Sequence, residues 1–162
     1  MSDLQTVAAL ADQLDGSADE RAAAAEALAQ LGSDCSAACI PLVRACGTDE
    51  MTREWATAAL EEMGPPPAEV VPELIHLTED PTTGVAYWAI TLLGRSEDQA
   101  DGACETLAKL INSDRDLSLR ERAVWAVEKI GCQSPAIIEA LTIASQQSSH
   151  ARLARLAGKA LP

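Results

Sequence analysis

The residues whose types could support chemistry in this chain are its five cysteines and two histidines. Cys35, Cys39 and Cys46 fall within one expected helix, where the first two share a face, and thiolates and imidazoles are ligands for zinc and related metals. A single C-x-x-x-C without a second ligand pair is a weak metal motif, and the sequence holds no C-x-x-C or H-x-x-x-H. We therefore expect these thiols to be buried between helices, and we expect no metal or cofactor site.

The other candidate residues are dispersed. Cys104 and Cys132 are isolated and are expected to be packing residues, since an odd number of cysteines is typical of free thiols in a reducing compartment. His76 and His150 fall in different segments, where a structural histidine is commoner than a catalytic one. The chain has no glycine-rich phosphate loop, no G-x-S-x-G elbow, and too many carboxylates to single out an acid–base pair. We therefore expect no enzymatic activity.

Composition limits the function further. The 162 residues are enough for one domain, and the lack of Phe, with one Tyr and three Trp, leaves a core of Ala and Leu that favours closely packed helices over sheets. The net charge of −13 disfavours nucleic acids and anionic membranes as partners. No apolar stretch is long enough for a transmembrane helix, and residues 1–4 lack the pattern of a signal peptide, so we expect a cytoplasmic protein.

A repeat of about 32 residues organises the chain. Apolar stretches end at Gly32, Gly64, Gly94, Gly131 and Pro162, and alanine recurs eight and five residues before each of these positions. This spacing places the alanines on one face of a helix, which another helix can approach closely. We expect five repeats, each ending in such a helix, which we call the second helix. The expected repeats are 1–32, 33–64, 65–96, 97–132 and 133–162.

Each second helix is preceded by another apolar segment, the first helix. Ser17 with Glu20 forms a potential capping box, and Ser2 and Ser134 are expected N-caps. Glycine follows four of the second helices and is expected to end them. The expected first helices are 3–14, 36–46, 67–78, 102–112 and 135–146.

Several motifs resemble those of HEAT-repeat proteins, in particular the short bacterial HEAT-like repeats also found in phycobilin lyase subunits. They are Ile40-Pro41 and Val71-Pro72, the Asp49…Arg53 and Asp116…Arg120 pairs, and the Ala-x-x-Ala-Leu/Val-x-x-Leu/Ile-Gly endings. The resemblance implies an all-α, right-handed superhelix of about five helix pairs, with the first helices bent at their prolines and the second helices lining the concave side. Thr83 and Ala151 stand where arginine would, so an Asp–Arg ladder between repeats is expected to be interrupted.

Such repeats serve many functions, so the function must be argued from the surface. Positions three, six and ten before each repeat end face away from the alanine stripe, into the expected groove. Trp88 and Trp125 would stand there side by side on an acidic strip and could anchor a partner. Alternatively, the rings only fill space and the glutamates only solvate the protein. The residues predicted to bind a partner are Trp88, Trp125, Glu54, Glu61, Glu121, Glu128, Arg152 and Lys159, and Leu156 shares their face.

Charge is divided along the chain. Residues 1–114 carry 5 Lys and Arg against 21 Asp and Glu, whereas residues 115–162 carry 7 against 4. We predict a non-enzymatic, cytoplasmic protein-interaction module that binds a protein segment, with a basic part of that segment toward the N-terminal end. The alternatives are an accessory subunit of an enzyme such as a bilin lyase, with a tetrapyrrole held against Trp88 and Trp125, self-association through the last repeat, and a fragment of a longer array.

Overall fold

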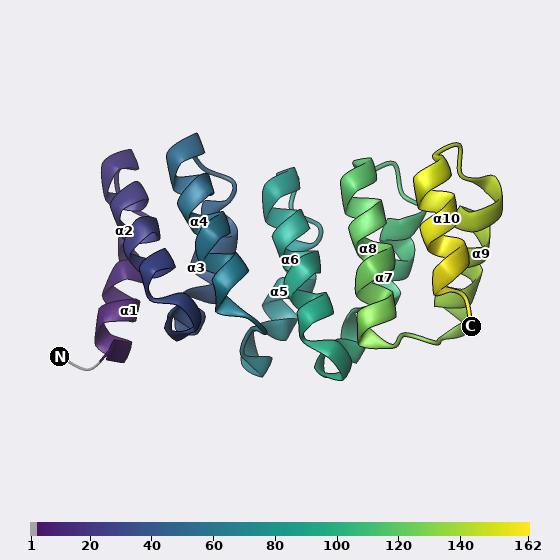
Figure 1. Cartoon of the computed structure of the whole chain (residues 1–162), viewed down its shortest axis with the longest axis horizontal. Helices are drawn as coiled ribbons and strands as arrows, with labels where there is room; N and C mark the ends of the chain where they lie inside the picture. Colours follow the sequence, from purple (N-terminus) through teal and green to yellow (C-terminus); the bar gives the residue numbers. More distant parts are fainter. Residues whose placement is uncertain (1–2) are drawn as a thin grey trace.

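The computed structural model describes residues 3–162, which fold into α-helices joined by short turns, without β-strands in that range (Figure 1). Consecutive helices form five pairs, which confirms an all-α solenoid. The α-helices of the described part are α1 Asp3–Gln13, α2 Ala18–Gln30, α3 Cys39–Ala45, α4 Glu50–Met63, α5 Val71–Leu77, α6 Thr83–Arg95, α7 Cys104–Ile111, α8 Leu117–Ile130, α9 Pro135–Gln147 and α10 Ala151–Ala160.

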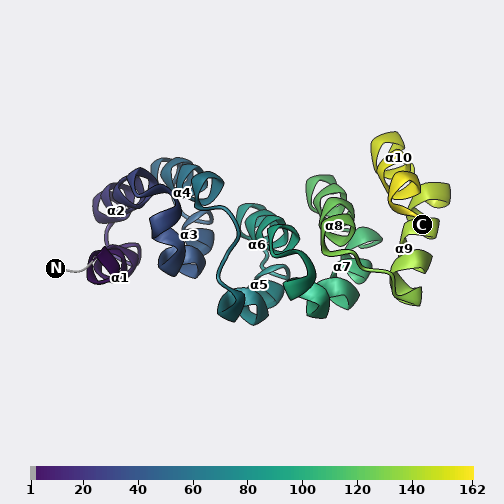
Figure 2. The same ribbon diagram turned by 60° about the horizontal axis from the view of Figure 1, so that its bottom comes forward.

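The helices form two rows. Figure 2 shows the second helices, α2, α4, α6, α8 and α10, along one side and the first helices, α1, α3, α5, α7 and α9, along the other. The row of second helices dips at α6 and α8 and rises again at α10, so this surface is concave between α4 and α10. None of the helices described is both long and apolar enough to cross a membrane.

The alanine stripe of the second helices is buried in the core, where neighbouring helices meet. Eight of the ten aligned alanines are buried, and Ala27 and Ala154 are half-buried. Small side chains at these positions let α2 approach α4, and α6 approach α8, over much of their length. The buried alanines are Ala24, Ala56, Ala59, Ala86, Ala89, Ala123, Ala126 and Ala157.

The prolines begin helices and do not bend them, which differs from the expectation. Pro72 is in the first turn of α5, and Pro41 is the third residue of α3. The residues before α3, α5 and α7 form the 3-10 segments Gly32–Ala38, Ala68–Val70 and Glu97–Ala103. The reason is that a proline has no N–H, and the first N–H groups of a helix have no helical partner in any case.

The helix ends follow the sequence signals in most places. Ser17 and Glu20 form the capping box of α2, and the Ser134 hydroxyl accepts a hydrogen bond from the Ile137 N–H at the start of α9. The N-cap expected at Ser2 lies outside the described residues. Gly64 and Gly131 follow α4 and α8 with φ of 78° and 83°, a conformation that favours glycine.

The polar ladder between repeats is interrupted in the middle of the chain. Arg21 of the first repeat donates to Asp49 of the second at 3.0 Å, and Thr83 of the third donates to Asp116 of the fourth. Arg53 holds the same position in the second repeat but forms none of the ion pairs found among residues 3–162. Between the second and third repeats, α4 also makes no extended contact with α6.

Other contacts join the second and third repeats across this seam. The end of α3 packs on the start of α6, where a Cβ atom on Gly84 would lie 2.9 Å from the Cys46 carbonyl oxygen. The Arg95 guanidinium, from the end of α6, donates to the Leu60 carbonyl oxygen in the last turn of α4 at 2.7 Å. Arg95 therefore binds a helix C-terminus, where a positive charge is favourable.

Asp49 gives the first testable prediction. Its carboxylate accepts hydrogen bonds from the Thr52 N–H, Arg21 and the Thr52 hydroxyl, which together lower its pKa from 3.8 to about 2. Because the pKa is lower in the folded state, the stabilisation is complete above pH 3.8 and is lost as the pH falls through about 2. We expect Asp49→Asn to be less stable than the wild type at neutral pH, with the difference vanishing over this acidic range.

Urea unfolding followed by circular dichroism, repeated across that pH range, measures this effect. Asp114→Asn is the matched control, because Asp114 is exposed and makes none of the side-chain hydrogen bonds or ion pairs found among the described residues. A constant difference between Asp49→Asn and the wild type from neutral to acidic pH would contradict the prediction.

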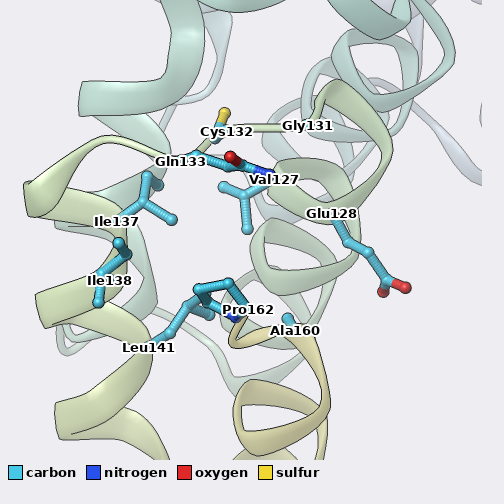
Figure 3. Close-up of a pocket in the computed structure, with 10 residues that line it drawn as sticks. All are labelled: Val127, Glu128, Gly131, Cys132, Gln133, Ile137, Ile138, Leu141, Ala160 and Pro162. Atoms are coloured by element: carbon cyan, nitrogen blue, oxygen red, sulfur yellow. The ribbon is translucent and has the colours of Figure 1, made fainter.

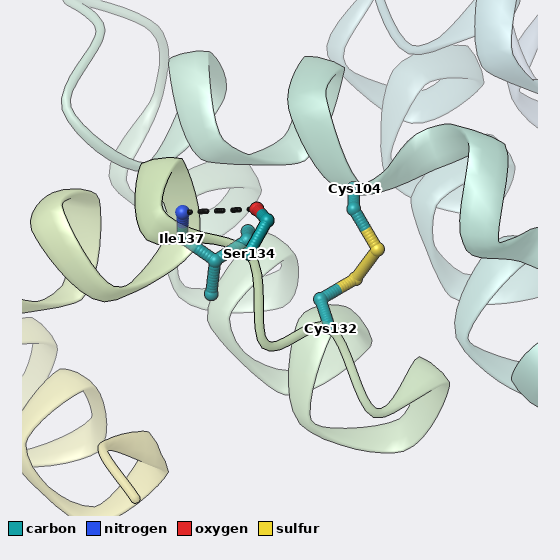
Figure 4. The surroundings of a disulfide bond; sticks show 4 residues. All are labelled: Cys104, Cys132, Ser134 and Ile137. Carbon is teal, nitrogen blue, oxygen red and sulfur yellow. Dashed lines mark hydrogen bonds between the residues drawn. A yellow bond between two sulfur atoms is a disulfide. The ribbon is translucent and has the colours of Figure 1, made fainter.

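Two of the five cysteines form a disulfide, so the expectation that both are isolated packing residues is wrong. Cys104 at the start of α7 is bonded to Cys132 in the turn after α8, next to the Ser134 N-cap of α9 (Figure 4). The fold brings their Cα atoms to 5.8 Å although they are 28 residues apart in sequence. The buried Cys35, Cys39 and Cys46 are free, as expected. Because disulfides form in oxidising environments, the cysteines no longer favour a reducing compartment.

Candidate functional site

A cleft opens on the row of second helices, between α6, α8 and α10. Its volume is about 310 Å³, and we call it the second-helix cleft. Helix α8 supplies most of its wall, because side chains at spacings of three, four and seven residues share one helical face. The lining residues are Tyr87 from α6, Ser118, Glu121, Arg122 and Trp125 from α8, and Arg152 and Leu156 from α10.

The Arg122 guanidinium is held by two aromatic rings. Its central carbon lies 4.6 Å from the centroid of Tyr87 and 4.9 Å from that of Trp125, and its Nη2 donates to the Tyr87 hydroxyl. A planar cation on aromatic faces is attracted by the ring quadrupoles. The three side chains therefore form one ordered cluster across α6 and α8.

Trp125 is positioned by a glycine of the neighbouring repeat. The nearest atom of its ring, Cζ3, lies 2.3 Å from the place where a Cβ atom on Gly94 would stand. Gly94 was expected to end a helix, but it lies inside α6, which continues to Arg95. The missing side chain lets the Trp125 ring rest on the backbone of α6, half-buried against the core.

The charges of the cleft differ from the uniform acidic strip that was expected. Its one lining carboxylate, Glu121, is 13% exposed and lies 3.4 Å from Arg152, whose side chain is 70% exposed. The two arginines therefore outnumber the carboxylate, and α10 adds the exposed Arg155 and Lys159. The exposed acidic residues of the second helices lie mainly on α2 and α4, at Glu26, Glu54, Glu61 and Glu62.

Trp88 does not lie on the exposed surface, so the expected pair of exposed tryptophans is wrong. Its side chain is 8% exposed, and the Arg95 guanidinium lies 5.7 Å from the centroid of its ring. Arg95 reaches α4, whereas Tyr87 contacts Arg122 of α8, so these two residues of α6 contact opposite neighbours.

The structure brings together three of the eight predicted binding residues, Trp125, Glu121 and Arg152. Glu54, Glu61, Glu128 and Lys159 are exposed outside the cleft. Sequence reasoning missed Ser118 and the Tyr87–Arg122 pair, because it considered only positions that face directly away from the alanine stripe. The sequence pattern that could have indicated the pair is an aromatic residue, Tyr87, seven positions before one repeat end and an arginine, Arg122, nine positions before the next.

Gly94→Ala tests how Trp125 is positioned. The added methyl group would overlap the Trp125 ring, which must move, so we expect a loss of stability of about 1–3 kcal/mol and a change in tryptophan fluorescence. Gly102→Ala is the control, because its Cβ atom would meet only Ile75 Cδ1, at 3.9 Å. Urea unfolding measures both, and equal stability of the two variants would show that Trp125 does not depend on Gly94.

A second hollow of about 190 Å³ lies beside the disulfide, between α8, α9 and α10 (Figure 3). Ile137, Ile138, Leu141 and Pro162 line it with apolar groups. Figure 3 shows that Glu128, at its rim, directs its carboxylate away from the hollow. This site offers mainly apolar surface, and Gln133 is the one polar side chain besides Glu128 among its lining residues.

Comparisons with known families agree with the fold. HEAT repeats match residues 71–162, and the PBS lyase HEAT-like repeat matches residues 20–47. The fold is that of an α-solenoid, and its surface carries a cleft lined by aromatic and charged side chains. The chain belongs to the HEAT-repeat family. Among curated proteins no match to the chain was found.

Two solved structures share this fold. One is an engineered protein with a TM-score of 0.61 and 22% sequence identity, and the match covers 99% of this chain and 78% of that one. The other is described as computationally designed armadillo repeat proteins for modular peptide recognition, with a TM-score of 0.58, 19% identity, and coverage of 94% and 79%. At these identities the likeness establishes the architecture alone.

Proposed function

We propose that the chain is a non-enzymatic interaction module that binds a segment of another protein along its second helices and anchors it in the second-helix cleft. The observation that carries the proposal is the ordered cluster of Tyr87, Arg122 and Trp125 at the wall of an open cleft. Tryptophan, tyrosine and arginine are the residues most enriched among binding hot spots. The designed armadillo neighbour, described as made for peptide recognition, supports a segment as the ligand.

Charge gives the proposed segment a direction. The exposed glutamates on α2 and α4, Glu26, Glu54 and Glu61, would attract a basic part of the segment. The second-helix cleft lies at the other end of the same row, about the basic α10. A basic stretch that precedes or follows an anchor residue therefore fits this surface better than a uniformly charged segment.

Site-specific photo-crosslinking tests this proposal. A benzophenone amino acid at Ser118, in the cleft, is expected to capture a protein that the same group at Glu105, exposed on the first helix α7, does not capture. The captured protein is then purified and its affinity measured. Trp125→Ala is expected to weaken binding by about 30-fold, the size of a hot-spot effect.

Trp88→Phe is the matched control, because it alters a buried tryptophan outside the cleft and should leave the affinity within about twofold. The proposal fails if both crosslinking positions capture the same proteins, or if Trp125→Ala binds the purified partner as the wild type does.

A second candidate, an accessory subunit of an enzyme such as a bilin lyase, is favoured by the match of residues 20–47 to the PBS lyase HEAT-like repeat. A tetrapyrrole would have to stack on Trp125 and Tyr87, since Trp88 is buried. Added bilin should then quench tryptophan fluorescence and gain an induced circular dichroism signal. Quenching that is unchanged in Trp125→Ala would count against this candidate.

Two further expectations remain predictions. Self-association through the last repeat rests on Leu156 and Leu161, since Leu153 is buried, and analytical ultracentrifugation would measure it. The redox state of Cys104 and Cys132 in the cell would indicate the compartment of the protein. A reducing cytoplasm would leave them as thiols, whereas an oxidising compartment would preserve their disulfide.

A further inference from the structure

We infer that the second-helix cleft recognises a carboxylate held beside an apolar side chain, so that the anchor of the bound segment is an Asp or Glu next to a Phe, Leu or similar residue. The inference rests on the proposed function, the binding of a protein segment in this cleft, and it names the chemistry of the anchor.

Arg122 is the first group that points to a carboxylate. Its guanidinium is stacked on Tyr87 and Trp125 and gives one N–H to the Tyr87 hydroxyl. It forms none of the ion pairs found among residues 3–162. A guanidinium has five N–H donors in a fixed plane, and a stacked one presents its edge in the geometry that binds a carboxylate through two hydrogen bonds.

Arg152 is the second group. It contacts Glu121 through Nε at 3.4 Å, and its side chain is 70% exposed at the mouth of the cleft. Glu121 is the one carboxylate that lines the cleft, and this pairing offsets its charge. Residues 140–162 contain no Asp or Glu, so α10 places no further negative charge beside Arg152. The terminal nitrogens of Arg152 therefore face a region with an excess of positive charge.

The apolar part of the anchor follows from the remaining lining residues. Trp125 and Leu156 contribute an aromatic and an aliphatic surface to the lining of the cleft. A volume of about 310 Å³ is at the lower end of the range for ligand pockets, which suits one or two side chains. A carboxylate alone would leave this apolar surface exposed to water, so an apolar neighbour is part of the fit.

A basic anchor fits less well, although the chain as a whole is acidic. The acidic residues of α2 and α4 lie on helices that do not line the cleft, and charges separated by more than about 8 Å are largely screened at physiological ionic strength. The charged residues that line the cleft are Arg122, Arg152 and Glu121, and because the two arginines outnumber the glutamate, the cleft favours a carboxylate over Lys or Arg. The acidic anchor and the basic flank proposed above are therefore bound at opposite ends of the same surface.

A pair of capped dipeptides tests the inference on the full chain. N-acetyl-Phe-Glu-amide and N-acetyl-Phe-Lys-amide are titrated while the three indole N–H signals of the tryptophans are followed by NMR. The Phe-Glu compound is expected to shift the Trp125 signal and to bind at least about fivefold more tightly than the Phe-Lys compound. The signal of Trp88, which is buried, should stay in place.

Variants identify the groups responsible. Arg152→Gln, at an exposed position, and Arg122→Lys, which keeps the charge but loses the planar edge, are each expected to weaken binding of the Phe-Glu compound by about tenfold. Arg53→Gln is the control, because Arg53 is an exposed arginine of α4 outside the cleft. Unchanged binding in both cleft variants would overturn the inference.

The results also separate the inference from the proposed function. If both dipeptides shift Trp125 with equal affinity, or the Phe-Lys compound binds better, the cleft binds side chains but the acidic anchor is wrong. If neither compound shifts Trp125 at millimolar concentration, the inference is overturned, while the crosslinking experiment still decides the proposed function independently.

Discussion

Removing the Cys104–Cys132 disulfide is expected to lower the free energy of unfolding by about 3–4 kcal/mol, the value for a closed loop of this length. The bond joins residues 28 apart and restricts the unfolded chain across the whole fourth repeat. For a domain of this size the loss corresponds to a decrease of roughly 10 °C in Tm. Thermal and urea unfolding of the Cys104→Ser/Cys132→Ser double variant, beside the wild type, measure both quantities.

Dithiothreitol provides the control for this experiment. The reductant should lower the stability of the wild type to that of the double variant and should leave the double variant unchanged. Equal midpoints for the wild type with and without reductant would contradict the prediction.

Thiol counting checks the same assignment chemically. In the folded, unreduced protein the three free thiols are buried, and burial raises the pKa of Cys39 and Cys46 to about 12, so we expect little reaction with Ellman's reagent. Unfolding without reductant should expose three thiols, and unfolding after reduction should expose five. Five thiols without reduction would show that the disulfide is absent.

Trp88→Ala is expected to lower the free energy of unfolding by about 3–5 kcal/mol, because it removes a large buried side chain. The Trp88 ring also supports Arg95, which links α6 to the Leu60 carbonyl of α4. In a repeat array, stability depends on the interfaces between neighbours. We therefore expect the first two repeats to unfold before the last three in this variant.

Urea unfolding followed by circular dichroism and by tryptophan fluorescence measures this loss of cooperativity. The two signals should report one transition in the wild type and separate transitions in Trp88→Ala. Trp125→Ala is the informative comparison, because its effect on partner binding should exceed its effect on stability. Identical unfolding of Trp88→Ala and the wild type would mean that Trp88 does not hold the seam together.

These two tryptophans show how far sequence analysis could go. They share the same offset in adjacent repeats, so the repeat pattern assigns them the same orientation. In the structure Trp125 rests on Gly94 at the wall of a cleft, whereas Trp88 is buried beside Arg95. The exposure of a side chain at a repeat interface depends on the spacing of the neighbouring repeat, which its own offset does not encode.

Features that depend on local spacing could be predicted from the amino-acid sequence. The repeat of about 32 residues, the buried alanine stripe, the capping box at Ser17 and the N-cap at Ser134 all follow from helical periodicity and from the hydrogen-bonding needs of helix ends.

Features that depend on distances between repeats could be seen only in the three-dimensional structure. Three of these features bring together residues about 30 positions apart: the disulfide of Cys104 and Cys132, the contact of Gly94 with Trp125, and the contact of Arg122 with Tyr87. The burial of Trp88 likewise depends on the packing of neighbouring helices. Small differences in the packing of adjacent helix pairs set these distances. The physical reason is that helical periodicity fixes directions within one helix, while the position of the next helix is fixed by the packing of all the side chains between them.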